Sequence, residues 1–414
     1  MNNIIYINDI KTEKNKIDYE YTVKGDWKKY FKLSEKFFIE YSENIFEVSK
    51  SISAIPLLCN ILPIAWLCNA KIFIDELDKD FFESIRDFKK GYINMYPMLS
   101  FDGDLIISKL VDNTYNQENK TAMFFSGGVD SFFSLISHIR KKPSLVTIWG
   151  SDIFFNDIEG WNNVKDQVLA TSGKINVNYV FIKSCFRLFL EEKSLNELVE
   201  KSKDKWWHGF QHGIGLIGHV APYAYKKKLK TVYIASSFTI EDKGNITCAS
   251  DPTIDNCLRF CGCKIVHDGY QLSRQEKIKK ICEFAEKNKI KIDLRVCWVS
   301  KGGRNCCKCE KCYRTILGII AEGYNYENFG FNNVDFKKIE NDVKEKIHFD
   351  NIMIAYWKGI QKRYVNRKNN FDVSKELDWL VKINFKKINN KPKKVIREYL
   401  KKIRSIAKNA TSHG

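Results

Sequence analysis

The chain has 414 residues, of which 44% are hydrophobic and 29% charged, and it carries a formal net charge of +18. The hydrophobic fraction supports a buried core and excludes a disordered chain, and the length is comfortable for two domains. The net charge favours anionic partners such as nucleotides, nucleic acid or a membrane surface. The positive charge is concentrated near the C-terminus, because residues 382–408 hold 11 Lys or Arg and one acidic residue and so contribute +10.

The first 75 residues give no sign of export or of membrane insertion. Residues 1–16 lack a basic region followed by a long apolar stretch, so we expect no signal peptide. The apolar segment 52–74 is interrupted by two prolines and two asparagines, and we interpret it as buried strands and turns rather than a membrane span. With 13 cysteines and no export signal, the chain is expected in the reducing cytoplasm, where clustered cysteines indicate metal before disulfides.

Residues 1–115 are predicted to form an N-terminal α+β domain. Segments 3–9 and 17–23 have the composition of strands, and segment 79–96 has the apolar spacing of an amphipathic helix. The region carries no recognisable chemistry, so we expect it to support the fold or to bind a protein partner. The polar segment 112–120 is the expected boundary.

Residues 121–322 are predicted to form an α/β domain. A short buried strand at 121–125, a helix at 131–142 and a strand at 144–149 indicate a parallel βαβ unit. This alternation predicts an open, mostly parallel α/β sheet with helices on both faces. Further apolar strands are expected at 177–183, 231–237, 263–269 and 294–300.

Residues 323–414 are predicted to be helical and basic. Segment 393–408 places its apolar residues on one helical face and its cations elsewhere. Such a helix either docks on the body of the protein or contacts an acidic partner, nucleic acid or lipid headgroups. Nucleic acid is the less favoured partner for the chain as a whole.

The segment Ser126-Gly127-Gly128-Val129-Asp130-Ser131 joins the strand at 121–125 to the helix that follows. A loop at a helix N-terminus presents unpaired backbone N–H groups, and glycines let the backbone approach an anion closely. Together with the two serine hydroxyls, these groups suit a pyrophosphate. The simpler alternative is a tight turn in which Asp130 or Ser131 caps the helix.

The Ser-Gly-Gly-x-Asp-Ser pattern in this strand–loop–helix setting resembles the pyrophosphate loop of the N-type ATP pyrophosphatases. The resemblance implies a Rossmann-like enzyme that adenylates a carboxylate or amide oxygen, releases pyrophosphate, and lets a nitrogen nucleophile displace AMP. It also implies that residues 126–131 bind ATP, that Mg²⁺ bridges the phosphates, and that Ser126, Asp130 and Ser131 carry catalysis. The adenosine would lie at the end of the next strand, at Trp149, Gly150 and Asp152.

Five cysteines lie within residues 297–312. Without Cys307 the spacing is C-x8-C-x2-C-x2-C, in which four thiolates can close a tetrahedral zinc site. The alternative is a set of free structural cysteines. This spacing, after a Ser-Gly-Gly-x-Asp-Ser loop, resembles the 7-cyano-7-deazaguanine synthase family, and the resemblance covers residues 121–315. The predicted Zn²⁺ ligands are Cys297, Cys306, Cys309 and Cys312.

The substrate side of the site is predicted at the ends of the later strands, where open α/β sheets bind ligands. Turn capping is the plainer role for the two aspartates near residue 253, and three histidines between 208 and 219 are either packing or functional residues. The substrate is expected to be a carboxylate-bearing small molecule, such as a 7-deazaguanine-type acid, or a protein terminus. The predicted contacts are Ser236, Ser237, Asp251, His267 and Asp268.

Two other functions stay open. An RNA-modifying thiolase of the same superfamily would need a reactive cysteine near the loop, and the candidates are Cys185, Cys248 and Cys257. A non-catalytic nucleotide sensor or assembly subunit would bind ATP without releasing AMP. Strong, salt-dependent RNA binding would favour the first of these, and ATP binding without turnover would favour the second.

Overall fold

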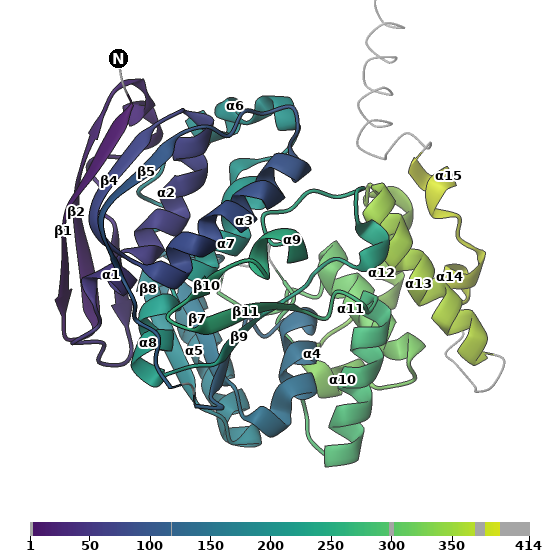
Figure 1. Ribbon diagram of the computed structural model, residues 1–414. Helices are drawn as coiled ribbons and strands as arrows, with labels where there is room; N and C mark the ends of the chain where they lie inside the picture. Colours follow the sequence, from purple (N-terminus) through teal and green to yellow (C-terminus); the bar gives the residue numbers. More distant parts are fainter. Residues whose placement is uncertain (1–2, 117, 298–301, 369–376, 390–414) are drawn as a thin grey trace, which may run out of the picture. The chain divides into compact units, whose positions relative to one another are not determined.

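The computed structural model describes residues 3–116, 118–297, 302–368 and 377–389 (Figure 1). The chain divides into two compact units, Met1–Ser273 and Arg274–Gly414. Segment 393–408, predicted to be a basic amphipathic helix, lies within residues 390–414, which are outside the described part of the chain. Among the residues that are described, no helix is long and apolar enough to cross a membrane.

The first unit is built on one 11-stranded sheet in the order β10-β11-β9-β6-β7-β8-β3-β2-β1-β4-β5. Six of the ten pairings between the described strands are parallel, so the predicted α/β class with a mostly parallel sheet is confirmed. The strands are β1 (Ile4–Glu13), β2 (Lys16–Lys24), β3 (Phe38–Tyr41), β4 (Lys71–Asp78), β5 (Asp104–Val111), β6 (Thr121–Phe124), β7 (Ser144–Trp149), β8 (Tyr179–Ser184), β9 (Thr231–Ala235), β10 (Arg259–Phe260) and β11 (Cys263–Asp268).

Helices of the first unit connect and cover these strands (Figure 1). α4 packs against β6 and β9, and α5 packs against β7 and β8. The α-helices are α1 (Lys50–Ser53), α2 (Ile55–Leu67), α3 (Lys79–Met95), α4 (Val129–His138), α5 (Ile158–Ile175), α6 (Glu192–Leu198), α7 (His212–Gly218), α8 (Ala221–Lys227) and α9 (Pro252–Asp255). A π-helix, η4, spans Trp207–Gln211, and short 3₁₀ helices are η1 (Asp26–Tyr30), η2 (Ile139–Lys141), η3 (Glu200–Ser202) and η5 (Ile240–Asp242).

The parallel centre of the sheet positions the candidate site. β6 lies between β7 and β9, and β9 in turn pairs with β11, all in parallel. The carboxyl ends of parallel strands meet at one edge of a sheet, which is where ligands of open α/β sheets bind. The segments that follow β6, β7, β9 and β11 therefore share that edge.

The interpretation of segment 52–74 as strands and turns is wrong over most of its length. The residues form α1 and α2, and only the last few belong to β4. Pro56 stands in the first turn of α2, where a missing N–H costs no hydrogen bond. Almost every residue of α2 is buried, so the helix has no polar face and lacks the amphipathic spacing by which a surface helix is identified.

The predicted boundary at 112–120 does not separate compact units. β3 pairs with β8 through Ile39 and Ser184, so strands from before and after the boundary belong to one sheet. One hydrophobic core also runs across it and includes Leu58 of α2 and Ile217 of α7. The compact unit ends at Ser273 rather than at 322.

The second unit is helical in most of its described part. The expected strand at 294–300 is not formed by residues 294–297, and residues 298–300 lie outside the described part. A hydrophobic core forms around Trp357, Leu317 and Phe385. The helices are α10 (Arg274–Asn288), α11 (Glu310–Ala321), η6 (Tyr326–Phe329), α12 (Phe336–Glu345), α13 (Asn351–Lys368), α14 (Asp378–Lys382) and α15 (Phe385–Asn389).

Candidate functional site

The loop between β6 and α4 makes a tight turn from strand to helix. Gly127 has φ +77°, a left-handed backbone conformation that side chains rarely adopt, so glycine is strongly favoured at this position. Gly128 is the N-cap residue of α4, and no side chain caps the helix. Asp130 and Ser131 therefore do not play the capping role that was the simpler alternative.

The two serines of the loop face one another. Ser126 Oγ lies 3.3 Å from Ser131 Oγ and accepts a hydrogen bond from the backbone N–H of Gly128 at 3.4 Å. Ser131 Oγ also donates to the carbonyl of Gly128 at 3.1 Å. The structure thus gathers the two hydroxyls, the glycine backbone and the first turn of α4 in one place, and Val129 at the start of α4 is buried.

The predicted adenosine residues follow β7 at the same edge of the sheet. A Cβ on Gly150 would lie 2.0 Å from the carbonyl oxygen of Ser184, so only glycine fits there. The Trp149 ring stacks on Trp161 with a centroid distance of 5.1 Å. Asp152 is exposed in the turn that follows.

Two of the predicted substrate residues line a small pocket at the carboxyl ends of β9 and β11. These are Asp251 and His267. Asp251 also caps α9 by accepting from the Thr253 N–H at 2.8 Å, as the plainer interpretation expects. His267 is buried, and its Nδ1 lies 2.8 Å from Asp255 Oδ2. The pocket is lined by Phe238, Asp242, Lys243, Ile246, Cys248, Ser250, Asp251, His267 and Tyr270.

The other predicted substrate residues lie apart from that lining. Asp268 accepts from Ser134 Oγ at 2.5 Å and lies 3.1 Å from His138 Nε2, so it contacts α4. Ser236 is buried, and its Oγ donates to the carbonyl of Phe238. Ser237 is exposed. The structure therefore joins Asp251 and His267 in one pocket and directs Asp268 towards the helix that follows the loop.

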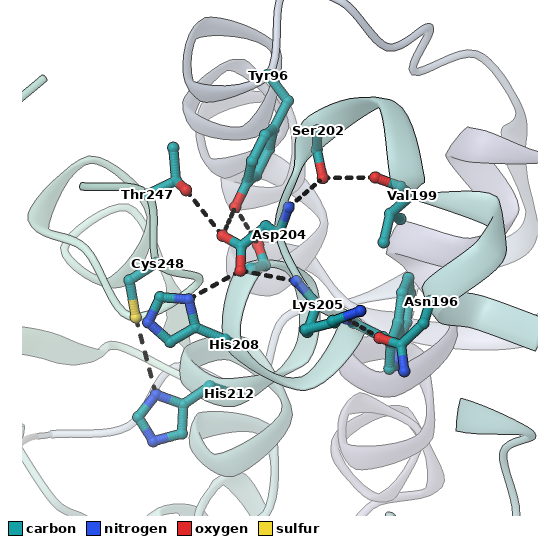
Figure 2. Close-up of polar contacts among 12 residues, drawn as sticks. Tyr96, Asn196, Val199, Ser202, Asp204, Lys205, His208, His212, Thr247 and Cys248 are labelled. Carbon is teal, nitrogen blue, oxygen red and sulfur yellow. Dashed lines mark hydrogen bonds and ion pairs between the residues drawn. The ribbon is translucent and has the colours of Figure 1, made fainter. Parts of the chain in front are cut away.

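A cluster whose convergence the sequence analysis did not predict lies beside the pocket (Figure 2). We call Asp204, His208, His212 and Cys248 the thiol cluster. His208 Nδ1 lies 3.0 Å from Asp204 Oδ1, and Cys248 Sγ lies 4.0 Å from His212 Nδ1. The spacing D-x3-H-x3-H from 204 to 212 would place the three residues on one helical face, and that signal could have pointed to Asp204.

The surroundings of the three cysteines considered for a thiolase differ. Burial raises the pKa of Cys185 to about 11, and burial also raises the pKa of Cys257. Burial acts in the same direction on Cys248, but hydrogen bonds from His208 and His212 more than offset it and lower the pKa to about 7. Cys248 is therefore the one of the three that has the surroundings of a reactive thiol.

The third of the histidines, His219, is a packing residue. It is fully buried, its Nδ1 lies 2.5 Å from the carbonyl oxygen of Gly215, and its Nε2 lies 2.8 Å from Ser184 Oγ. Burial lowers the pKa of His219 to about 4, so the ring is neutral at physiological pH.

In the second unit, the four cysteines predicted as zinc ligands converge. The sulfur atoms of Cys297, Cys306, Cys309 and Cys312 all lie within 4.8 Å of one another. The Cys297–Cys309 and Cys306–Cys312 distances are 3.8 and 3.9 Å. Zn–S bonds of about 2.3 Å in a tetrahedron place sulfurs about 3.8 Å apart, so the set could hold a metal ion such as zinc.

Neighbouring backbone and amide groups order this four-cysteine site. Asn305 accepts hydrogen bonds from the N–H groups of Val296 and Cys297, and its amide donates to the carbonyl of Leu294 at 2.7 Å. The Lys308 N–H donates to Cys306 Sγ at 3.3 Å. Such contacts fix the ligands in place before metal binds. Cys307 is not a member of the converging group.

Comparisons with known proteins leave the family of the chain open, because no family model, curated protein or solved structure matches it significantly.

Proposed function

We propose that the chain is an ATP-dependent ligase with a Rossmann-like nucleotide-binding domain. It would adenylate a carboxylate or amide oxygen, release pyrophosphate, and let a nitrogen nucleophile displace AMP. The observation that carries the proposal is the turn from β6 to α4, where Gly127 is left-handed and α4 begins at Val129, after the N-cap residue Gly128 and without a side-chain cap. This arrangement suits an anion, because the first N–H groups of a helix have no partner within the helix.

The loop residues would act on pyrophosphate as it leaves. Breaking the α–β phosphate bond concentrates negative charge on the departing group, and preorganised N–H and O–H donors stabilise that charge. Ser126 and Ser131 would supply the hydroxyls, which already lie 3.3 Å apart. Asp130, in the first turn of α4, would help to hold Mg²⁺, which neutralises the phosphates. The adenosine would lie towards Trp149, Gly150 and Asp152.

The test of the proposal combines binding and products. Calorimetry with ATP and Mg²⁺ measures binding in the absence of an acceptor, and chromatography after addition of a 7-deazaguanine carboxylic acid and ammonium identifies the products. We expect equal amounts of AMP and pyrophosphate. Formation of ADP and phosphate instead would contradict the proposal.

Gly128→Val is the matched variant. The backbone of Gly128, with φ −81° and ψ 173°, is extended and open to valine, so the protein should fold. The branched side chain would project where the phosphates lie, and ATP binding should be lost. Unchanged ATP binding by folded Gly128→Val would show that the loop is not the nucleotide site. Ser126→Ala and Ser131→Ala each remove one donor and should each slow AMP formation about a hundredfold.

A further inference from the structure

The thiol cluster arranges a thiol, an imidazole and a carboxylate in series. Figure 2 shows the His208 ring between the Asp204 carboxylate and the Cys248 sulfur, with the His212 ring below that sulfur and joined to it by a dashed line. His208 Nδ1 lies 3.0 Å from Asp204 Oδ1, which orients the ring. A nucleophile, a base and a group that orients the base, in that order, is the general arrangement for covalent catalysis by a side chain.

Bonds on both sides of Cys248 fix its position against His208. The Thr247 hydroxyl donates to Asp204 Oδ2 at 2.7 Å, and the Ala249 N–H donates to the carbonyl of His208 at 2.8 Å. The residues before and after Cys248 are thus tied to the turn that carries the imidazole. His208 itself lies in the π-helix η4, a form that is found frequently at functional sites.

The carboxylate is held as firmly as the thiol. Tyr96, which follows α3, donates from its hydroxyl to Asp204 Oδ2 at 2.9 Å, and the backbone N–H of Lys205 donates to Asp204 Oδ1 at 2.8 Å. With these donors Asp204 stays ionised. The hydrogen bond between His208 and the Asp204 carboxylate is the main cause that raises the pKa of His208 to about 10. His208 is therefore an imidazolium beside the thiol at neutral pH.

The charges around the cluster favour a thiolate. Burial opposes ionisation of Cys248, but hydrogen bonds from His208 and His212 bring its pKa to about 7. Burial also opposes protonation of His212, but its bond to Cys248 raises the pKa of the ring. Four titratable groups outside the cluster also act on it electrostatically, namely Tyr92, Tyr96, Asp152 and Asp255.

Cys248 also borders space for a ligand. Although 5% exposed, it lines the pocket together with Phe238, Lys243 and Tyr270. That pocket follows β9, which pairs with β6, the strand that leads into the Ser126–Ser131 loop. Among the described residues, the four cysteines of the second unit are the set that converges as metal ligands do, so the thiol cluster is better explained as a nucleophilic site.

We propose that Cys248 is a catalytic nucleophile that accepts an acyl group from an activated carbonyl carbon, with His208 as its proton-transfer partner and Asp204 as a positioning residue. The acyl donor rests on the proposed function, since it would be the adenylate made at the loop. The Cys248 thiolate attacks the carbonyl carbon, a C–S bond forms, and the C–O bond to AMP breaks. The phosphate oxygen of AMP leaves with the electron pair and takes the proton of His208.

The second half of the reaction restores the cluster. An amine or ammonia attacks the thioester, a C–N bond forms and the C–S bond breaks. The sulfur of Cys248 leaves with the electron pair as a thiolate, and the proton lost by the nitrogen returns to His208. Atoms and charges balance without an oxidant or a reductant.

The experiment uses the full chain and p-nitrophenyl acetate, an activated acyl donor that needs no nucleotide. We expect a burst of about one nitrophenolate per chain, and peptide mass spectrometry should place the acetyl group on Cys248. Cys248→Ala should abolish the burst. Cys68→Ala is the matched control, because Cys68 is partly buried and burial raises its pKa to about 12, so the burst should persist.

The pH dependence of the burst tests the role of His208. The wild-type rate should rise with pH through about 7, where Cys248 ionises. His208→Ala should move that rise towards about 8.5, the value of an ordinary thiol. At pH 7 the rate should fall only a few-fold, because the more basic thiolate is also the better nucleophile. Acetylation spread evenly over several cysteines, or an unchanged pH profile in folded His208→Ala, would overturn the proposal.

Two further measurements separate this proposal from the proposed function. Folded Gly128→Val should lose ATP binding and keep the acetylation burst, because the loop takes no part in that reaction. In the wild type, the amide product of ATP turnover should depend on Cys248. Full turnover by Cys248→Ala would overturn the acyl-transfer role, and a persulfide on Cys248 in the purified protein would overturn it in favour of sulfur transfer.

Discussion

Cysteine occurs in two contrasting settings in this protein. In the second unit, four sulfur atoms converge within 4.8 Å, and backbone N–H groups and the Asn305 amide surround them. In the first unit, a single sulfur atom, that of Cys248, lies near two imidazoles and borders a pocket. The first setting can give each thiolate the same partner, a shared metal ion, whereas the second gives one thiolate two imidazole neighbours.

The difference shows that neighbours decide what a thiolate does. A thiolate bound to a metal in a closed site has its charge neutralised and its lone pair engaged, so it stabilises the fold. A thiolate paired with an imidazolium keeps a lone pair for an electrophile, and the imidazolium can deliver a proton to the leaving group. Variants that change one setting and leave the other intact test whether the two kinds of cysteine behave differently.

The largest effect is expected from Cys309→Ser. A structural metal couples binding to folding, so loss of one ligand should release the metal and lower the Tm by on the order of 10 °C. Metal content by mass spectrometry and a thermal melt of the full chain provide the measurement. Cys307→Ser is the control and should do neither, because Cys307 lies outside the converging group. A metal-free wild type, or equal effects of both variants, would refute the site.

Protection from alkylation should separate the two settings in a single sample. At pH 7 iodoacetamide should modify Cys248 first, because its pKa is about 7, while metal-bound cysteines stay protected. A chelator should expose Cys297, Cys306, Cys309 and Cys312 to the reagent and leave the rate at Cys248 unchanged. Peptide mass spectrometry measures each position. If chelation altered the rate at Cys248, the two settings would not be independent.

Local spacing explains what the sequence could predict. The four metal-site cysteines lie within 16 residues of chain, and the loop from 126 to 131 is six consecutive residues between a strand and a helix. Such signals need no knowledge of the fold, and both segments have the expected local structure. The thiol cluster has no such local signal, because its residues are far apart in the sequence. Cys248 follows His208 by 40 residues, and Tyr96 precedes Asp204 by 108. Only the crossover after β9 and the end of α3 bring them together.

The wrong predictions for segments 52–74 and 112–120 have the same origin, because local sequence does not show where a segment lies in the fold. Helix α2 is buried on all sides, so its sequence lacks the polar face that marks a helix, and its composition resembles that of buried strands. The polar segment 112–120 follows β5, a strand at the edge of the sheet with largely exposed side chains, and polarity there reflects the edge rather than a domain boundary.

A moderate effect is expected from Asp204→Asn, which tests how the Cys248 thiol of the second setting is activated. Asparagine keeps the shape but removes the charge that chiefly raises the pKa of His208. With less positive charge beside it, Cys248 should ionise at higher pH, and the rise of the acetylation rate should move upward by about one unit. The pH profile of the p-nitrophenyl acetate burst measures this. An unmoved profile in a folded variant would exclude Asp204 as a positioning residue.

Tyr96→Phe should have the smallest effect, and the direction in which it shifts the pH profile of the burst is informative. The Tyr96 hydroxyl donates to Asp204 Oδ2 at 2.9 Å, so its removal leaves the carboxylate charge more available to His208. The imidazolium should be slightly stabilised, and the rise of the burst rate should move down by a few tenths of a unit, opposite to Asp204→Asn. Tyr92→Phe is the control, because Tyr92 lies one turn earlier, in α3, is equally buried, and donates from its hydroxyl to the carbonyl of Phe210. Both variants should cost about 1 kcal/mol of unfolding free energy, and only Tyr96→Phe should move the profile. An upward shift in Tyr96→Phe would mean that the hydroxyl acts by ordering the cluster rather than through the charge of Asp204.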